Sequence, residues 1–386
     1  MLFLLTCLLL SDSTSFWERW PFADHPGLGW LLLASLVWPM VVLLATGWEA
    51  ASASRLFHIV RVAWVLTLGL MLRPNEAWQA VYGLLIGAGL SVTVILVHQV
   101  WPLPDNPLWA KLLIVDGNAS SQKMIMLACT AGVGLWLALQ NRHGTLHRVL
   151  LLSLAGAAMT AAARYGYSRN AYLLLVLLPG ALFLYRLRHH RAALWVPPVL
   201  VLTIFALAWS LSPVMQARWL RAVSELQASL AGLDYEGSSV GVRWAMFRLA
   251  WDSIWAHPLL GTGLGSWEPI WHAHSVQAPL MSLTNNPHND FLLYGMETGL
   301  PGMLILATTL GWFLWKSWVN HSPLGGIAFL LAIAVVVTAT INAPFRDATL
   351  GMSLIWLMAA TTSLHTRLPQ THSDQHVVMT PKPNTP

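Results

Sequence analysis

Charged residues are scarce in this chain, and their scarcity excludes an ordinary water-soluble domain. Asp, Glu, Lys and Arg make up 10% of the 386 residues, whereas a soluble domain carries about 25%. Hydrophobic residues make up 56% of the chain, and the mean hydropathy is +0.58. So little polar surface cannot face water on all sides, and we therefore expect the chain to lie in a lipid bilayer.

Several chemical signatures are also missing. The two cysteines, Cys7 and Cys129, are too few for a disulfide framework. The sequence has no P-loop, no Gly-rich dinucleotide motif, no Gly-x-Ser-x-Gly elbow and no Asp-x-Asp pair. His272 and His274 could begin a metal site, but no third ligand follows at a suitable spacing. We therefore expect no metal, no cofactor and no nucleic-acid partner.

Long apolar runs take the place of these signatures. About 20 apolar residues cross a bilayer as a helix. Candidate spans lie at residues 28–46, 56–72, 78–100, 122–140, 147–163, 170–187, 193–211, 301–319, 324–342 and 349–364. Residues 1–10 form a further, short apolar segment. The sequence thus predicts an all-α, polytopic membrane protein with about 10 to 12 transmembrane helices.

The spans are interrupted once, by residues 212–287, which hold charges, Pro, Gly and amphipathic stretches. A connection of this length is uncommon unless it is functional. We expect an N-terminal bundle at 1–211, a catalytic loop region with short helices at 212–300, and three spans at 301–365. Residues 366–386 are polar and Pro-rich, which predicts a disordered cytoplasmic tail.

Basic residues in the short loops predict the orientation of the chain in the membrane. Cytoplasmic loops carry an excess of Lys and Arg. The basic residues that fall on one side are Arg73, Arg142, Arg148, Arg186, Arg188, Arg191, Lys316 and Arg367. We therefore expect that side to be cytoplasmic, and residues 212–287 to face outward.

Among the basic residues on the outer side, four arginines are candidates that the charge rule does not explain. Arg164 and Arg169 stand at the outer mouth between two spans, Arg243 in the long loop, and Arg346 in the last outer turn. Arginines beside or within a bilayer are costly and are candidates for function. All four are therefore candidates for binding an anionic substrate. For Arg164 we favour the alternative, snorkelling to lipid headgroups.

The surroundings of Arg243 point to an anion site. Ser238 or Ser239 is a predicted N-cap, which places Arg243 in about the first turn of a helix. Backbone N–H groups and a guanidinium at a helix start suit phosphate oxygens. A salt bridge to Asp234 or Glu236 would explain Arg243 equally well.

His288 is the candidate general base. Asn286 resembles an N-cap and Pro287 a first helical residue, so His288 is predicted in the first turn. The positive helix end favours a neutral imidazole there, the form that a general base needs. A purely structural histidine is the alternative. Further residues of this segment are expected to support the site, with the glycines permitting close approach or a break: Asn289, Glu297, Gly299 and Gly302.

Three segments together resemble the O-antigen ligase family, which shares a superfamily with the O-antigen polymerases. Ser168 and Arg169 open a span. Residues 241–267 read GVRWAMFRLAWDSIWAHPLLGTGLGSW, with an Arg, a His-Pro pair and a Gly-x-Gly-x-Gly turn. Residues 287–302 read PHNDFLLYGMETGLPG, similar to the family's His-Asn…Glu-x-Gly-x-x-Gly signature. Many spans, one large outer loop and three last spans also follow the family's order.

The resemblance implies an inverting glycosyltransferase that needs no metal. Its donor would be a glycan on undecaprenyl diphosphate, in the outer leaflet of the bacterial inner membrane, and its acceptor a sugar hydroxyl of lipid A–core. Family roles carried over by position make Arg169 and Arg243 diphosphate binders and His288 the general base. An O-antigen or exopolysaccharide polymerase, which extends another lipid-linked glycan, is the alternative within the superfamily. An anion transporter is more distant, because the sequence shows no internal repeat.

Overall fold

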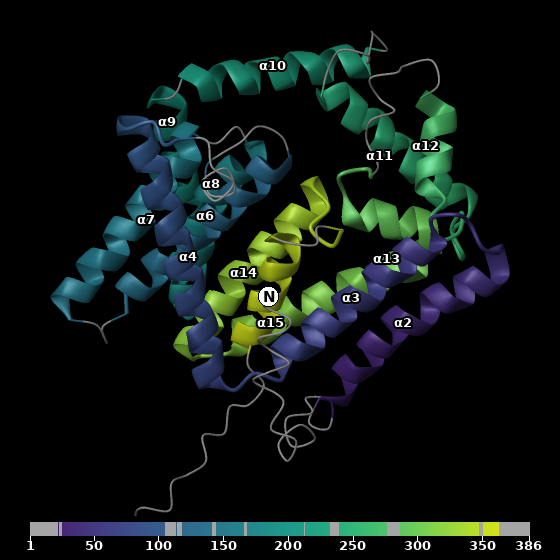
Figure 1. Cartoon of the computed structure of the whole chain (residues 1–386), viewed down its shortest axis with the longest axis horizontal. Helices are drawn as coiled ribbons and strands as arrows, with labels where there is room; N and C mark the ends of the chain where they lie inside the picture. The colour runs from purple at the N-terminus through teal and green to yellow at the C-terminus, as the bar shows by residue number, and fades with distance from the viewer. Residues whose placement is uncertain are drawn as a thin grey trace, which may run out of the picture.

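A computed structural model describes most of the chain. The described residues are 22, 25–104, 113, 118–140, 144–165, 168–211, 213–231, 239–275, 286–346 and 350–362. All the regular elements in these ranges are helices (Figure 1). The apolar segment at 1–10 and the polar tail at 366–386 lie outside the described residues.

The helices before residue 212 follow the predicted spans closely. Their bounds are α2 Pro26–Thr46, α3 Ser52–Leu70, α4 Pro74–Val100, α6 Asn118–Ala138, α7 Thr145–Tyr165, α8 Arg169–Leu187, the short 3-10 helix η1 Arg191–Leu194, and α9 Val196–Leu211. The remaining helices are α10 Pro213–Leu230, α11 Ser239–Ala256, α12 Trp267–Ser275, α13 Asp290–Val319, α14 Pro323–Ile341 and α15 Leu350–Thr362.

Local signals set several of these ends. At the start of α4, the Glu76 carboxylate accepts a hydrogen bond from the backbone N–H of Arg73 at 2.8 Å, as in a capping box. At the start of α14, the Ser322 hydroxyl accepts from the backbone N–H of Gly325 at 3.1 Å, and a proline follows it at the first helical position. Such signals explain why the apolar runs begin as helices where they do.

Seven of the described helices are long and apolar enough to cross a membrane: α2, α3, α4, α7, α8, α13 and α14. Helix α6 coincides with the predicted span at 122–140, and α9 and α15 coincide with those at 193–211 and 349–364. Helices α9 and α15 are shorter, with 16 and 13 residues. The chain is therefore an all-α, polytopic membrane protein, as the sequence predicted.

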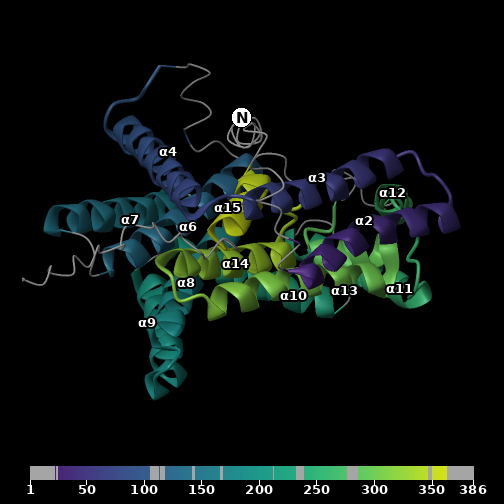
Figure 2. The ribbon, with the colours of Figure 1, turned by 90° about the horizontal axis from the view of Figure 1, so that it is seen from below.

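Helices α14 and α15 lie at the centre of the bundle. Helices α4, α6, α7 and α8 flank them on one side, and α2, α3 and α13 on the other, in both views (Figures 1 and 2). One large apolar core joins these helices, with side chains such as Leu182 of α8, Phe313 of α13 and Ile355 of α15 fully buried in it. Figure 2 shows α9 projecting away from this bundle.

The predicted outer region forms α10, α11 and α12, none of which meets the criteria for a membrane span. Helix α10 runs from the end of α9 to the start of α11 (Figure 1). Helices α11 and α12 pack on the first turns of α13 through a second, smaller core. Its buried residues are Met246, Ala250, Ile254, Trp267, Trp271, Leu293 and Met296.

The start of α13 differs from the sequence prediction. The helix begins at Asp290, and its N-cap is Asn289, whose side chain accepts from the backbone N–H of Leu292 at 3.0 Å. Asn286 instead accepts from the backbone N–H of His288 at 2.9 Å, which makes a turn before the helix. The prediction that Asn286 caps the helix and that His288 lies in its first turn is therefore wrong.

Candidate functional site

The helix ends that the sequence predicted as outer meet at one end of the bundle. The hydroxyls of Ser121 in α6 and Ser168 before α8 lie 2.7 Å apart. The Arg61 side chain of α3 donates to the backbone carbonyl of Arg346, after α14, at 3.1 Å. Most of the candidate residues lie at this end.

Arg169, Arg243 and His288 come together there from three separate segments. Burial lowers the pKa of Arg243, and the positive charge of Arg169 lowers it further. Burial also lowers the pKa of His288, and the charge of Arg243 adds to this effect. The three residues therefore form one electrostatically coupled group, which we call the Arg169–Arg243–His288 cluster.

Arg169 is the first residue of α8. Ser168 is the N-cap, and its hydroxyl accepts from the backbone N–H of Ala171 at 3.3 Å. Arg169 is half-buried beside the positive end of the helix. A guanidinium next to a helix N-terminus forms a strongly anion-attracting position.

Arg243 lies just past the first turn of α11, which begins at Ser239. It is half-buried. The ion pairs between described residues include none to Arg243. Asp234 and Glu236, its alternative partners, lie outside the described residues, so the salt-bridge alternative stays open.

His288 is held in an uncommon backbone conformation. Its φ is 52°, in the left-handed region that few non-glycine residues adopt. The Asn342 side chain hydrogen-bonds the imidazole and works against the lowering of its pKa. Its Nδ1 atom is buried and has no hydrogen-bond partner among the described residues. The imidazole is therefore fixed in place and favoured in its neutral form.

A second charged cluster lies beside the first. Arg55 of α3 and Glu297 of α13 form an ion pair in which Nε and Oε2 are 2.5 Å apart, and the Arg55 guanidinium lies 5.9 Å from the centre of the Tyr294 ring. Arg346 pairs with Glu268 of α12 at 3.5 Å. The ionisable members of the second cluster are Arg55, Arg61, Glu268, Asp290, Glu297 and Arg346.

The second cluster holds as many carboxylates as arginines, unlike the Arg169–Arg243–His288 cluster. It ties α3, α12, α13 and the turn after α14 to one another. Asp290 contributes by accepting from the backbone N–H of Phe345 at 3.2 Å. Burial and the charge of Arg55 lower the pKa of Arg346, while Glu297 and Glu268 oppose this. Arg346, predicted as a substrate binder, is thus already engaged with carboxylates.

Sequence reasoning did not identify Arg55, Arg61, Glu268 or Asp290. A signal was present for the two arginines, because Arg61 falls inside the predicted span at 56–72 and Arg55 at its edge. An arginine within a span is a functional candidate by default. Neither carboxylate stands in a pattern that distinguishes it from an ordinary helix-end residue.

The Gly-x-Gly-x-Gly turn docks on α13, where that helix bends. Gly299 has a φ of 72°, so the break predicted near it is present. The backbone N–H of Thr262 donates to the Met296 carbonyl at 2.7 Å, and that of Leu300 donates to the Pro258 carbonyl at 2.8 Å. These bonds satisfy polar backbone groups next to the bend and join two of the three family-like segments.

Two glycines make this docking possible. A Cβ atom at Gly261 would overlap the Met296 carbonyl oxygen, and one at Gly299 would overlap the Leu259 carbonyl oxygen. Gly261 also has a positive φ, of 67°. No other residue allows both the backbone conformation and this close approach. The expected boundary between the catalytic loop region and the last spans, at residue 300, falls next to this junction.

The other candidates occupy separate positions. Arg164 is exposed in the last turn of α7 and is not among the charges that act on Arg243 or His288. Gly302 packs against Thr298 and Trp38. His272 and His274 are both exposed in α12. Within the described ranges, no three His, Cys, Asp or Glu side chains are grouped to hold a metal ion.

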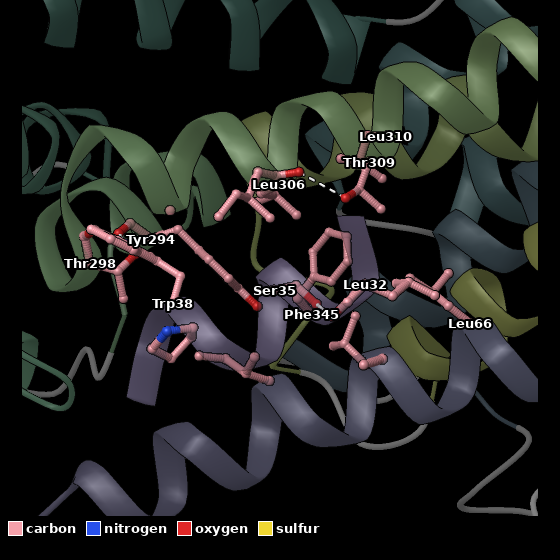
Figure 3. A pocket seen from close by; sticks show the side chains of 16 residues that line it. Leu32, Ser35, Trp38, Leu66, Tyr294, Thr298, Leu306, Thr309, Leu310 and Phe345 are labelled. Carbon is pink, nitrogen blue, oxygen red and sulfur yellow. Dashed lines mark hydrogen bonds between the residues drawn. The ribbon is translucent and has the colours of Figure 1, made fainter. Parts of the chain in front are cut away.

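An apolar cavity borders the second cluster (Figure 3). It lies between α2, α3 and α13, and Tyr294, which contacts Arg55, forms part of its wall. Trp38 lines the same wall and donates from its indole to the Thr298 carbonyl at 2.8 Å. The charged end of the bundle therefore passes directly into an apolar cavity between spanning helices.

Comparison with known proteins agrees with the three segments. A family model described as O-antigen ligase matches residues 154–307. That range contains Arg169, Arg243, His288 and Glu297, together with the docked glycine turn. No curated protein matches the chain. Residues 154–307 are therefore similar to the O-antigen ligase family, as the sequence resemblance predicted.

Proposed function

We propose that this chain is an inverting glycosyltransferase of the O-antigen ligase type. It transfers a glycan from undecaprenyl diphosphate to a sugar hydroxyl of lipid A–core at the periplasmic face of the bacterial inner membrane. The observation that carries the proposal is the meeting of Arg169, Arg243 and His288 at one end of the bundle, inside the matched domain.

The two arginines suit a diphosphate leaving group. Their like charges repel, which contributes to the lowered pKa of Arg243, and a diphosphate between them would relieve that repulsion. Negative charge grows on the diphosphate as its bond to the sugar breaks. Preorganised cations in a partly buried site stabilise such charge most effectively. Planar guanidinium groups also match phosphate oxygens in geometry.

His288 suits the role of general base. Its lowered pKa keeps the imidazole neutral near neutral pH, which a base requires. The acceptor hydroxyl gives its proton to His288 while its oxygen forms a bond to the anomeric carbon. The bond from that carbon to the diphosphate oxygen breaks on the opposite face, and the configuration inverts.

The lipid part of the donor fits the surroundings of the site. A polyprenyl chain needs an apolar environment. The site lies at the ends of membrane-spanning helices, and an apolar cavity borders the neighbouring second cluster. The diphosphate can therefore reach the arginines while its chain stays in the bilayer. With two arginines on the diphosphate, the reaction as proposed requires no metal ion.

The decisive experiment compares donor binding and transfer in the purified full chain. His288→Ala should retain binding of the lipid diphosphate and lose about 10²–10⁴-fold in single-turnover transfer. His272→Ala is the matched control, because His272 is an exposed histidine of α12. A well-folded His288→Ala protein that transfers sugar at the wild-type rate would refute the role of His288.

A deletion strain separates a ligase from a polymerase. Loss of polymer-capped lipopolysaccharide, with polymer accumulating on the lipid carrier, would support the ligase. Lipopolysaccharide capped with a single repeat would identify a polymerase instead. Complementation with the wild-type chain and with His288→Ala ties either phenotype to the proposed site.

A further inference from the structure

A pocket with cationic and aromatic walls lies at the end of the bundle opposite the proposed active site. Its volume is about 430 Å³, within the range of about 300–1,000 Å³ typical of ligand sites. It opens between the ends of α6 and α8 and the turn that joins α13 to α14. The residues that line this Arg188 pocket are Trp136, Leu139, Gln140, Tyr185, Arg186, Arg188, His189 and His321.

Arg188 is fixed in this pocket. Its guanidinium lies 3.9 Å from the centre of the Tyr185 ring and 5.7 Å from that of Trp318. Nη2 lies 2.7 Å from Nδ1 of His321. Nη1 is buried and has no hydrogen-bond partner among the described residues. Nε donates to Nε2 of His189 at 3.2 Å, and Nη2 also donates to the Asn320 carbonyl at 3.4 Å. The protein therefore holds the guanidinium at Nε and Nη2, and Nη1 is its unpaired donor.

The pocket carries positive charge without a countercharge. Arg186 and Arg188 line it together with two histidines, and no Asp or Glu is among the lining residues. Cations near the C-terminal end of α8 are favoured by the helix dipole, and Arg186 indeed donates to the Leu139 carbonyl at 2.9 Å. The helix dipole does not explain the guanidinium of Arg188, which stacks on Tyr185 and has one unpaired donor, Nη1. An anion would satisfy this donor.

The location indicates a lipid as the source of the anion. The pocket lies at the ends of spanning helices, where Trp and Tyr mark the boundary between membrane and water. Large apolar side chains at the same end are exposed on the protein surface, among them Leu146 at 74% and Trp195 at 72%. Acyl chains can cover such surface while a headgroup phosphate enters the pocket.

We propose that the Arg188 pocket binds the headgroup of an anionic phospholipid from the leaflet that surrounds this end of the bundle. Basic pockets between spanning helices on the cytoplasmic side suit such headgroups, and the basic loops predict that side here. The proposal does not rest on the proposed function, because it concerns the opposite end of the molecule and its test does not measure sugar transfer.

The test titrates the purified full chain in a neutral detergent with short-chain lipids. Dihexanoyl phosphatidylglycerol should bind and raise the melting temperature, whereas dihexanoyl phosphatidylcholine should do neither. Arg188→Lys keeps the charge but loses the stacked planar group, and should weaken phosphatidylglycerol binding about tenfold or more. Arg186→Ala and His321→Ala provide further pocket variants if Arg188→Lys lowers the stability of the protein.

Arg191→Ala is the matched control. Arg191 is an exposed basic residue of the same loop that does not line the pocket. The proposal fails if Arg191→Ala weakens binding as much as the pocket variants do, since binding would then be to diffuse surface charge. It also fails if the two lipids bind equally. Inorganic phosphate that binds as tightly as phosphatidylglycerol would overturn the lipid as the ligand.

Discussion

Arg55 and Glu297 form a buried ion pair between the N-terminal part of the chain and the region that matches the O-antigen ligase model. Their side chains are 5% and 1% exposed, and Nε lies 2.5 Å from Oε2. Glu297 is separated from Gly299, where α13 bends, by one residue. The pair therefore fixes α3 against the part of α13 that also receives the glycine turn.

Breaking this pair should destabilise the protein strongly. Glu297→Gln leaves the Arg55 charge buried without its partner, which typically costs about 3–5 kcal/mol. Unfolding of the purified protein in detergent measures the loss. Asp252→Asn is the control, because it removes an exposed pair with Arg248, which is worth about 0–1 kcal/mol. Equal losses in the two variants would contradict a special role for the buried pair.

The bend of α13 should not tolerate a side chain. Gly299→Ala places a Cβ on the Leu259 carbonyl oxygen at a residue with positive φ, so both stability and transfer should fall. Gly87→Ala in α4 meets nothing within 4 Å and should be neutral or stabilise by up to about 1 kcal/mol. Melting temperatures of the two variants test this. Gly299→Ala with wild-type stability would show that the junction can rearrange.

Transfer should require the planar guanidinium groups of the Arg169–Arg243–His288 cluster as well as their charge. Arg169→Ala and Arg243→Ala should each lower transfer about 10²–10³-fold, the usual effect of removing one preorganised donor. Arg→Lys at either position should restore only part of the activity. Arg248→Ala, in the same helix as Arg243 but exposed, should transfer normally. Near-normal transfer in both alanine variants would show that Arg169 and Arg243 do not bind the diphosphate.

The pH dependence of transfer should reflect the lowered pKa of His288. A base works only when unprotonated, so activity falls as pH drops through its pKa. Since burial and Arg243 lower that pKa, the acidic limb of kcat/KM should lie below about 6.5, the ordinary value for histidine. Asn342 opposes the lowering, so Asn342→Ala should move the limb further toward acid. If the acidic limb of kcat/KM lies above pH 6.5 and Asn342→Ala does not move it, the assignment of His288 as the base is contradicted.

Transfer should survive removal of divalent metal. In the proposed reaction, Arg169 and Arg243 meet the charge of the diphosphate. Single-turnover transfer in excess chelator should therefore match the untreated reaction. Loss of activity with chelator and its return with Mg²⁺ or Mn²⁺ would reveal a metal requirement.

The amino-acid sequence by itself determined the fold class and the ends of many helices. Apolar runs of spanning length, with Pro323 and the Ser322 cap at one start and the Ser168 cap at another, specify helices through local backbone rules alone. The three family-like segments likewise identified the domain, because a motif is a property of neighbouring residues. These features require no knowledge of how distant segments pack.

Tertiary structure decided where α13 begins and what surrounds His288. Asn286 and Asn289 are both suitable caps, and Pro287 favours the first. In the folded chain, Asn289 caps the helix, and Asp290 is tied to the backbone N–H of Phe345. Local propensity cannot choose between two good caps when a contact 55 residues away stabilises one of them.

Tertiary structure also decided which charges meet. The partner of Glu297 is Arg55, 242 residues away, in a segment recognised in the sequence only by its hydropathy. Arg346, for which the sequence predicts substrate binding, pairs with Glu268. The spacing of charges along the chain does not determine these pairs. They follow from the way the helices pack, which brings Arg55 of α3, Glu268 of α12 and Glu297 of α13 into one cluster.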